Sequence, residues 1–298
     1  MVKKELFRGV ATAIITPFKN DEIDYECLSS LIDRQISAGV EAIVVAGTTG
    51  EAATLTDGER IELYRKAREF TRGRACLILG TGSPDTRRAI EYTWAAREVG
   101  ADGALVVTPY YNKGTREGLY RHFRAITEAA DIPIILYNVP SRTGVNLDLD
   151  TLLRLGELPR IVGIKEASDS AERLAELSRL TDLLPLYSGA DALIYTALSL
   201  GGVGVISVVS NLYPEDTVEI CKQFFAGDIE KAREIQHGLA PVINSLFLDT
   251  NPAPVKYAMA KRSLCSPEMR LPMWLPTERC QRQIDRACEE YEGMRGYK

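Results

Sequence analysis

The sequence reads PIILYNV over residues 133–139 and IVGIKEA over residues 161–167, two apolar runs rich in β-branched residues. Runs of this length and composition are typical of strands that are buried on both faces of a parallel sheet. Six further runs of this kind bring the number to eight, and they cover residues 10–15, 42–46, 76–80, 104–108, 184–188 and 202–208. Strand-like segments therefore recur through the first two-thirds of the chain.

Segments with helical spacing lie between most of these runs. Apolar residues recur at i, i+3, i+4 and i+8 from Leu28 to Ile36, and Thr56 to Glu59 forms a capping-box pattern that starts the next helix. Eight strand–helix units predict an α/β fold of the (β/α)8 TIM-barrel type. An open doubly wound sheet remains the alternative, because periodicity does not reveal whether a sheet closes.

The last part of the chain predicts helices only. No strand-like run follows residue 213, and Asn251-Pro252 reads as an N-cap followed by proline at the first helical position. We therefore expect a (β/α)8 barrel over residues 1–225 and a helical C-terminal appendage over residues 226–298.

Composition excludes several classes of protein. The 298 residues carry a net charge of -5, which argues against a nucleic-acid binder, and no apolar run is long enough to cross a membrane. No secretory leader is evident, and the six scattered cysteines suit reduced thiols, so we expect a cytoplasmic protein. Only two histidines are present, so a histidine-rich metal centre or a Ser-His-Asp triad is not expected.

Candidate site residues, most of them polar, collect where the predicted strands end, which is the edge that carries the active site in barrels of this type. They are Thr48, Thr49, Tyr110, Tyr111, Tyr137, Arg142, Lys165, Gly189 and, within the last strand, Ile206 with its neighbour Ser207. Each has a purely structural interpretation, such as a tight turn, rim packing or a solvated charge. Their position on one face of a barrel favours a binding or catalytic site.

Lys165 is the residue with the most distinctive chemistry in this set. A lysine held among apolar groups has a lowered pKa, and its neutral amine can attack a carbonyl carbon. The structural alternative is a lysine that pairs with Glu166 or points into water. The sequence around Lys165 leaves both interpretations open.

Several motifs resemble the dihydrodipicolinate synthase family of pyruvate-dependent class I aldolases, a superfamily that includes N-acetylneuraminate lyase. The resemblance covers nearly the whole chain, and the motifs that carry it are 9–13, 47–51, 137–144, 163–167, 251–256 and 270–273. It implies a lyase that condenses pyruvate with L-aspartate 4-semialdehyde to give 4-hydroxy-tetrahydrodipicolinate, the opening step of the diaminopimelate and lysine pathway. It also implies a homotetramer built as a dimer of dimers, with no metal or organic cofactor.

The same resemblance implies a role for each site residue. Lys165 matches the lysine that forms a Schiff base with pyruvate. Thr48, Tyr137 and Tyr111 match a proton relay, in which Tyr111 reaches in from a neighbouring subunit. Thr49 and the Thr48 backbone match the site for the pyruvate carboxylate, with Gly189 and Ile206 beside it. Arg142 matches the residue that binds the carboxylate of aspartate semialdehyde.

Two other functions remain open from the sequence. Sister aldolases or lyases that act on N-acetylneuraminate or keto-deoxy-sugar acids share Lys165 and Tyr137, and a barrel of this kind can also serve as a non-catalytic binding module. Arg142 favours a second substrate with a carboxylate, because guanidinium binds carboxylate in a bidentate manner. An amine nucleophile favours catalysis over binding alone.

One departure from the family concerns inhibition by lysine. Feedback-inhibited members bind lysine through a serine, two histidines, an asparagine, a glutamate and a tyrosine. The matching positions here are Ala52, Asp57, Arg60, Pro84, Arg88 and Tyr110. Arg88 stands where the glutamate would bind the ammonium group of lysine, so we expect weak inhibition or none.

Overall fold

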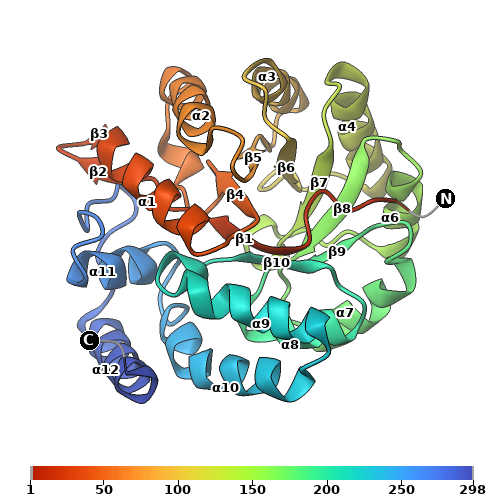
Figure 1. The fold of residues 1–298 in the computed structure, drawn as a ribbon. Helices are drawn as coiled ribbons and strands as arrows, with labels where there is room; N and C mark the ends of the chain where they lie inside the picture. Colours follow the sequence, from red (N-terminus) through yellow and green to blue (C-terminus); the bar gives the residue numbers. More distant parts are fainter. Residues whose placement is uncertain (1–2, 297–298) are drawn as a thin grey trace.

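The computed structural model describes residues 3–296, which form a closed barrel of eight parallel strands surrounded by helices (Figure 1). The barrel strands are β1 (Gly9–Ala13), β4 (Ala42–Val45), β5 (Cys76–Gly80), β6 (Gly103–Val107), β7 (Ile134–Asn138), β8 (Ile161–Glu166), β9 (Leu186–Ser188) and β10 (Gly204–Ser207). They follow around the barrel in the order β1-β10-β9-β8-β7-β6-β5-β4, and β1 pairs with both β4 and β10. The predicted (β/α)8 barrel is confirmed, and the open sheet is excluded.

Helices follow the strands and cover the outside of the barrel (Figure 1). They are α1 (Tyr25–Ser37), α2 (Asp57–Thr71), α3 (Thr86–Glu98), α4 (Arg116–Ala129), α5 (Pro140–Thr143), α6 (Leu149–Gly156), α7 (Ala171–Leu177), α8 (Ile194–Ser199) and α9 (Pro214–Ala226). Thr56 and Glu59 form the predicted capping box at the start of α2, with each side chain accepting a hydrogen bond from the other's backbone N–H.

Three further helices follow the barrel: α10 (Ile229–Ser245), α11 (Ala253–Lys261) and α12 (Glu278–Arg295). Helix α10 packs on α9, and α12 packs on α10 and α11. The predicted boundary after residue 225 falls in the last turn of α9. One detail of the prediction is wrong: α11 begins at Ala253 with Pro252 at its N-cap, and the Asn251 side chain donates to Thr49 instead of capping the helix.

Short elements that the sequence did not predict lie between β1 and α1 and in the loops. Strands β2 (Phe18–Lys19) and β3 (Glu22–Ile23) pair in an antiparallel hairpin. Residues 3–296 also contain four 3-10 turns: η1 (Ala52–Thr54), η2 (Ser178–Leu180), η3 (Asp191–Leu193) and η4 (Val209–Asn211). These elements span only two or three residues, which is too short to produce a periodic pattern.

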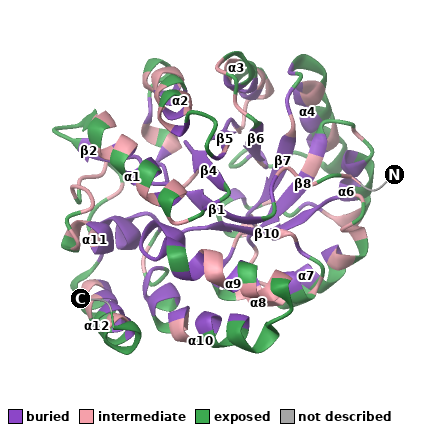
Figure 2. Cartoon of the chain, in the orientation of Figure 1, coloured by how far each residue is buried: buried purple, intermediate pink, exposed green. Residues whose placement is uncertain are grey.

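The hydrophobic core has an inner and an outer layer, and Figure 2 shows the barrel strands as its buried centre. The outer layer packs between strands and helices, whereas the inner layer fills the barrel. Phe7, just before β1, stacks on Tyr187 with ring centroids 4.4 Å apart and fills the end of the barrel where the strands begin. Open space is therefore left at the opposite end.

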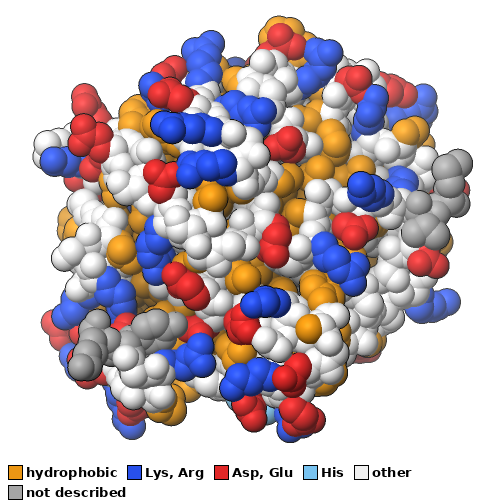
Figure 3. All heavy atoms as spheres, viewed as in Figure 1, with side chains coloured by type: hydrophobic (Ala, Val, Ile, Leu, Met, Phe, Trp, Pro, Cys, Tyr) orange, Lys and Arg blue, Asp and Glu red, His pale blue; other side chains and the backbone are white. Residues whose placement is uncertain are grey.

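The outer surface carries both signs of charge. Acidic and basic side chains are interspersed over the face shown in Figure 3. Within residues 3–296, no helix combines the length and the apolar character that a membrane crossing requires.

Candidate active site

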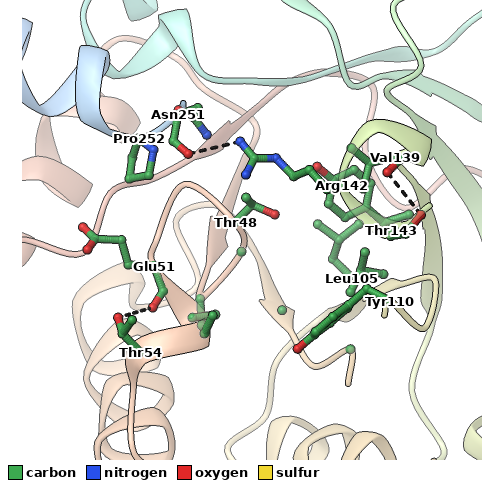
Figure 4. A pocket seen from close by; sticks show the side chains of 18 of the residues that line it. Thr48, Glu51, Thr54, Leu105, Tyr110, Val139, Arg142, Thr143, Asn251 and Pro252 are labelled. Atoms are coloured by element: carbon green, nitrogen blue, oxygen red, sulfur yellow. Dashed lines mark hydrogen bonds between the residues drawn. The ribbon is translucent and has the colours of Figure 1, made fainter. Parts of the chain in front are cut away.

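A cavity of about 330 Å³ opens at the C-terminal ends of the barrel strands (Figure 4). Its lining comes from the segments that end β4 to β7 and from the C-terminal region, including Asn251 and Met273. Three predicted site residues, Thr48, Tyr137 and Arg142, line it from separate segments. The strand-end rule therefore located the cavity correctly.

Lys165 lies next to this cavity, in β8, and only 5% of its surface is exposed. Its Nζ atom is 4.4 Å from the centroid of the Tyr137 ring, on the neighbouring strand β7. Because side chains alternate along a strand, Lys165 shares its face with Ala167, which belongs to the inner core. The amine therefore sits among apolar groups, beside a phenol that lines the cavity.

Glu166 faces the opposite side of β8 and does not pair with Lys165. Its carboxylate accepts hydrogen bonds from Asn138 Nδ2 at 2.9 Å and from the Ser168 backbone N–H at 3.0 Å, and it lies 3.5 Å from Arg173 Nε. Burial raises the pKa of Glu166, and the hydrogen bond from Asn138 opposes that shift. Among residues 3–296, Lys165 takes part in no ion pair, so the structural alternative of a Lys165–Glu166 pair is excluded.

Gly189 and Ile206 pack around the same centre without lining the cavity. A Cβ atom at Gly189 would lie 3.0 Å from Lys165 Cε and 2.6 Å from Ala167 Cβ, so a larger residue would displace the lysine stem. Ile206, in β10, belongs to the inner core together with Tyr137. Gly189 therefore leaves room for the lysine stem, and Ile206 packs in the same inner core as Tyr137.

Thr49 belongs to the loop that leaves β4, here called the β4 loop (residues 46–51). Two of its residues, Ala46 and Glu51, adopt left-handed backbone conformations with φ of 54° and 51°. The loop also packs against Gly80, where a Cβ atom would lie 2.1 Å from the Ala46 carbonyl oxygen. Thr49 is buried, and its Oγ1 accepts a hydrogen bond from Asn251 Nδ2 at 3.0 Å.

A buried ion pair holds the β4 loop to the C-terminal region. Lys256 Nζ, which is fully buried, donates to Glu51 Oε1 at 2.5 Å and to the Glu268 carbonyl oxygen at 2.9 Å. The Arg270 backbone N–H donates to Glu51 Oε2 at 3.1 Å. Burial lowers the pKa of Lys256, and the Glu51 carboxylate opposes that shift. The pair links two segments that each supply cavity-lining residues.

Tyr111 is the one predicted residue that lies apart from the others. Its side chain is 93% exposed, and it does not line the cavity of its own chain, although Tyr110 does. Its backbone φ of 72° is unusual for a bulky residue. Within a single chain, Tyr111 therefore lies outside the cavity that Thr48, Tyr137 and Arg142 line.

Two polar residues near the site were not predicted. Asp191 is buried after β9, and its Oδ2 atom accepts hydrogen bonds from the Val208 and Val209 backbone N–H groups at 3.0 and 2.9 Å. Burial raises the pKa of Asp191, and the Lys165 charge opposes that shift. The strand-end rule could have found Asp191, but Asn251 contacts the site from a segment that has no strand.

Four of the positions that match the lysine-binding site of the family are bonded in two pairs, Asp57 with Arg88 and Ala52 with Arg60. The Asp57 carboxylate accepts a hydrogen bond from Tyr92 Oη at 2.6 Å and lies 2.8 Å from Arg88 Nη1. The hydrogen bond from Tyr92 and the positive charge of Arg88 both keep the pKa of Asp57 below its ordinary value. The Arg60 guanidinium is buried, donates to the Ala52 carbonyl oxygen and lies 4.4 Å from the Tyr92 ring centroid. The site is thus occupied by the chain's own charged groups.

Comparisons with known proteins agree on one family. The model of the "Dihydrodipicolinate synthetase family" matches residues 6–291. A 4-hydroxy-tetrahydrodipicolinate synthase from Caldicellulosiruptor bescii is 45% identical over 96% of this chain and 97% of its own length. The structure of the corresponding enzyme from Methylacidiphilum fumariolicum SolV superposes with a TM-score of 0.95 at 41% identity, over 96% of each chain. A variant described as the first monomeric dihydrodipicolinate synthase gives a TM-score of 0.94 at 40% identity, over 96% of this chain and 97% of that chain.

Proposed function

The chain belongs to the dihydrodipicolinate synthetase family, and on that premise we propose that its Lys165 forms the Schiff base with pyruvate. The chain is a lyase that condenses pyruvate with L-aspartate 4-semialdehyde to give 4-hydroxy-tetrahydrodipicolinate, the opening step of the diaminopimelate and lysine pathway. The observation that carries the assignment of Lys165 is the position of its amine, buried beside Tyr137 at the edge of the cavity.

The reaction begins with a bond from Lys165 Nζ to C2 of pyruvate, and the keto oxygen leaves as water. Loss of a proton from C3 then gives an enamine, because the protonated imine accepts the electron pair. C3 of the enamine bonds to the aldehyde carbon of the second substrate, whose oxygen becomes the hydroxyl of the product. The amine of that substrate attacks C2, and the bond between C2 and Lys165 breaks.

These steps need groups that donate and accept protons at the amine. We assign Tyr137, Thr48 and Tyr111 to this relay, since hydroxyls both donate and accept hydrogen bonds. Tyr137 is the phenol beside Lys165, and Thr48 lines the same cavity. Tyr111 would act from a second copy of the chain, because its own chain leaves it exposed.

Two carboxylates must be bound, one on each substrate. We assign the pyruvate carboxylate to Thr49 and the Thr48 backbone N–H, with Gly189 and Ile206 shaping the wall beside Lys165. Arg142 lines the cavity from α5, the short helix after β7, and is assigned to the carboxylate of aspartate semialdehyde. The neutral site at Thr49 and the cationic site at Arg142 would hold pyruvate and aspartate semialdehyde at separate places in the cavity.

The choice of second substrate separates this function from that of the sister lyases. With pyruvate present, we expect condensation with aspartate semialdehyde and none with N-acetylmannosamine, because Arg142 lines the cavity and a guanidinium binds a carboxylate better than a neutral sugar. Product formation is measured by mass spectrometry for both aldehydes under the same conditions. Turnover of N-acetylmannosamine in preference to aspartate semialdehyde would assign the chain to the sugar-acid branch.

We also propose a homotetramer built from dimers, acting in the cytoplasm. The exposed Tyr111, with its left-handed backbone, supports a contact with a second chain. A strained, exposed aromatic residue costs stability unless another surface holds it, so the relay requires at least a dimer.

Inhibition by lysine is expected to be weak or absent. Arg88 stands at the position that matches the family's glutamate, so the carboxylate that would bind the ammonium group of lysine is missing, and Arg88 is paired with Asp57 instead. Initial rates measured with up to millimolar L-lysine should equal the rate without it, with D-lysine as the control for ionic strength. Inhibition at sub-millimolar L-lysine would contradict this prediction.

A further inference from the structure

Asn251 contacts both residues that we assign to carboxylate binding. Its side chain is 6% exposed and lies 202 positions along the chain from Thr49, to which Nδ2 donates a hydrogen bond at 3.0 Å. Its backbone oxygen accepts a hydrogen bond from Arg142 Nη2 at 3.1 Å, as the dashed line in Figure 4 shows. Asn251 itself lines the cavity. One residue of the C-terminal region therefore connects the two candidate carboxylate sites.

The direction of the hydrogen bond to Thr49 determines what the threonine can do. An amide NH₂ group can only donate, so Thr49 Oγ1 uses a lone pair and keeps its own proton. That proton remains free for a third group, and a hydroxyl that already accepts a hydrogen bond becomes a stronger donor. A substrate carboxylate is an acceptor only, and it is the partner that this arrangement suits.

The other half of the Asn251 amide defines the alternative orientation that a test must distinguish. Its Oδ1 atom is buried and has no hydrogen-bond partner within residues 3–296. Turning the amide over would satisfy Oδ1 from the Thr49 hydroxyl, but that would consume the proton that the carboxylate needs. Aspartate can only accept a hydrogen bond, so Asn251→Asp distinguishes the two orientations. If Nδ2 donates to Thr49, the substitution removes that donor and weakens pyruvate binding; if Oδ1 accepts from Thr49, the substitution keeps the hydrogen bond.

The surrounding structure holds Asn251 in place. The Ala253 backbone N–H donates to the Thr250 carbonyl oxygen at 3.1 Å, and the Lys256 backbone N–H donates to that of Pro252 at 3.0 Å, so the start of α11 is fixed on both sides of Asn251. The ion pair of Lys256 with Glu51 then ties α11 to the β4 loop that carries Thr49. The contact between Asn251 and Thr49 is thus made by two segments already joined in the core.

We propose that Asn251 is a positioning residue that orients the Thr49 hydroxyl proton toward the carboxylate of pyruvate. This inference rests on the proposed function. Only the side chain of Asn251 contacts Thr49, whereas its backbone holds Arg142, so removal of the side chain separates the two carboxylate sites. The binding of pyruvate should weaken, and the binding of aspartate semialdehyde should not.

The test measures the pyruvate concentration that gives half-saturation. It is obtained in two ways, from steady-state rates and from borohydride trapping of the lysine adduct. Asn251→Ala should raise both values about tenfold, because the Thr49 hydroxyl is no longer oriented for its hydrogen bond to the charged carboxylate, and leave KM for aspartate semialdehyde within about twofold. Asn251→Asp should raise them about 100-fold, because its carboxylate takes the Thr49 proton and repels the substrate. Asn244→Ala, an exposed asparagine of α10, is the matched control and should leave them unchanged.

A double-mutant cycle separates positioning from a general structural effect. In a Thr49→Val background, Asn251→Ala should raise the pyruvate concentration at half-saturation by less than about twofold, since the hydroxyl that Asn251 orients is gone. Equal losses for both substrates, an undiminished effect in that background, or an unchanged value in Asn251→Ala would overturn the proposal. If Asn251→Ala does not fold, Asn251→Leu, which is closer in size, takes its place. Absence of any adduct in the wild type would instead contradict the Schiff-base function itself.

Discussion

Lys165→Arg and Lys165→Ala are expected to lose kcat by at least about 10³-fold and to form no borohydride-stable adduct with pyruvate. Arginine keeps the positive charge but has no neutral amine at accessible pH, so the bond to C2 of pyruvate cannot form. The measurement is steady-state turnover together with the mass of the protein after reduction in the presence of pyruvate. Retention of the adduct in Lys165→Arg would show that another amine carries the chemistry.

Lys256 provides an internal control for this experiment. Within residues 3–296 it is a second buried lysine, but its Nζ donates to Glu51 and to the Glu268 backbone, whereas Lys165 Nζ lies beside the cavity-lining Tyr137. Peptide mapping of the reduced wild-type protein should place the added mass on Lys165 and leave Lys256 unmodified. Burial alone therefore does not identify the nucleophile, whereas position beside the cavity does.

The same variant tests whether Tyr111 acts from a second chain. In a mixed oligomer, the Tyr111→Phe chain keeps Lys165 and the Lys165→Ala chain keeps Tyr111. If the tyrosine comes from the partner, these two intact residues meet in one of the sites. Refolding an equal mixture should then restore up to about a quarter of the wild-type activity, whereas each variant alone remains deficient. An unrestored mixture would place Tyr111 in the site of its own chain or outside the relay.

Lys256→Met is expected to lower the free energy of unfolding by about 3–5 kcal/mol, because it leaves the Glu51 carboxylate buried without its cation. Replacement of both partners, Glu51→Gln with Lys256→Met, should recover part of this loss, since glutamine still accepts the hydrogen bond from the Arg270 backbone N–H. Denaturant unfolding followed by circular dichroism provides the measurement.

An exposed ion pair of α12 serves as the comparison for that loss. Arg282 and Glu278 have side chains that are 70% and 88% exposed, so Glu278→Gln should change the free energy of unfolding by less than about 0.5 kcal/mol. A Lys256→Met variant no less stable than Glu278→Gln would mean that the buried pair is dispensable. The position of the β4 loop would then have to be held by its backbone contacts.

Much of the barrel was predictable because its signal is local. The segment Cys76–Gly80 is a strand with the predicted bounds, and the other seven runs each overlap one barrel strand. A strand buried on both faces must be apolar throughout, which is visible in a single sequence. Closure of the sheet was not predictable in this way, because it depends on the pairing of β1 with β10, which are separated by nearly the whole barrel sequence.

The site was predictable where it obeys the strand-end rule. Thr48, Tyr137 and Arg142 line the cavity because they end or follow strands, and Lys165 lies beside them for the same reason. Asn251 was misassigned as a helix cap, because its motif matches one and its contact with Thr49 has no local signature. Contacts between distant segments depend on tertiary packing, which no periodic pattern reports.

The pairing of β1 with β10 also sets the order in which the chain can fold. Gly9 pairs with Gly204, so the two strands that close the barrel are 204 − 9 = 195 residues apart. At about 5–20 residues per second, translation of this stretch takes on the order of 10–40 s, during which β1 has an unpaired edge. Such long-range pairing makes folding slow relative to that of helical proteins of similar size. The barrel of the emerging chain can therefore close only after residue 204 has been synthesised.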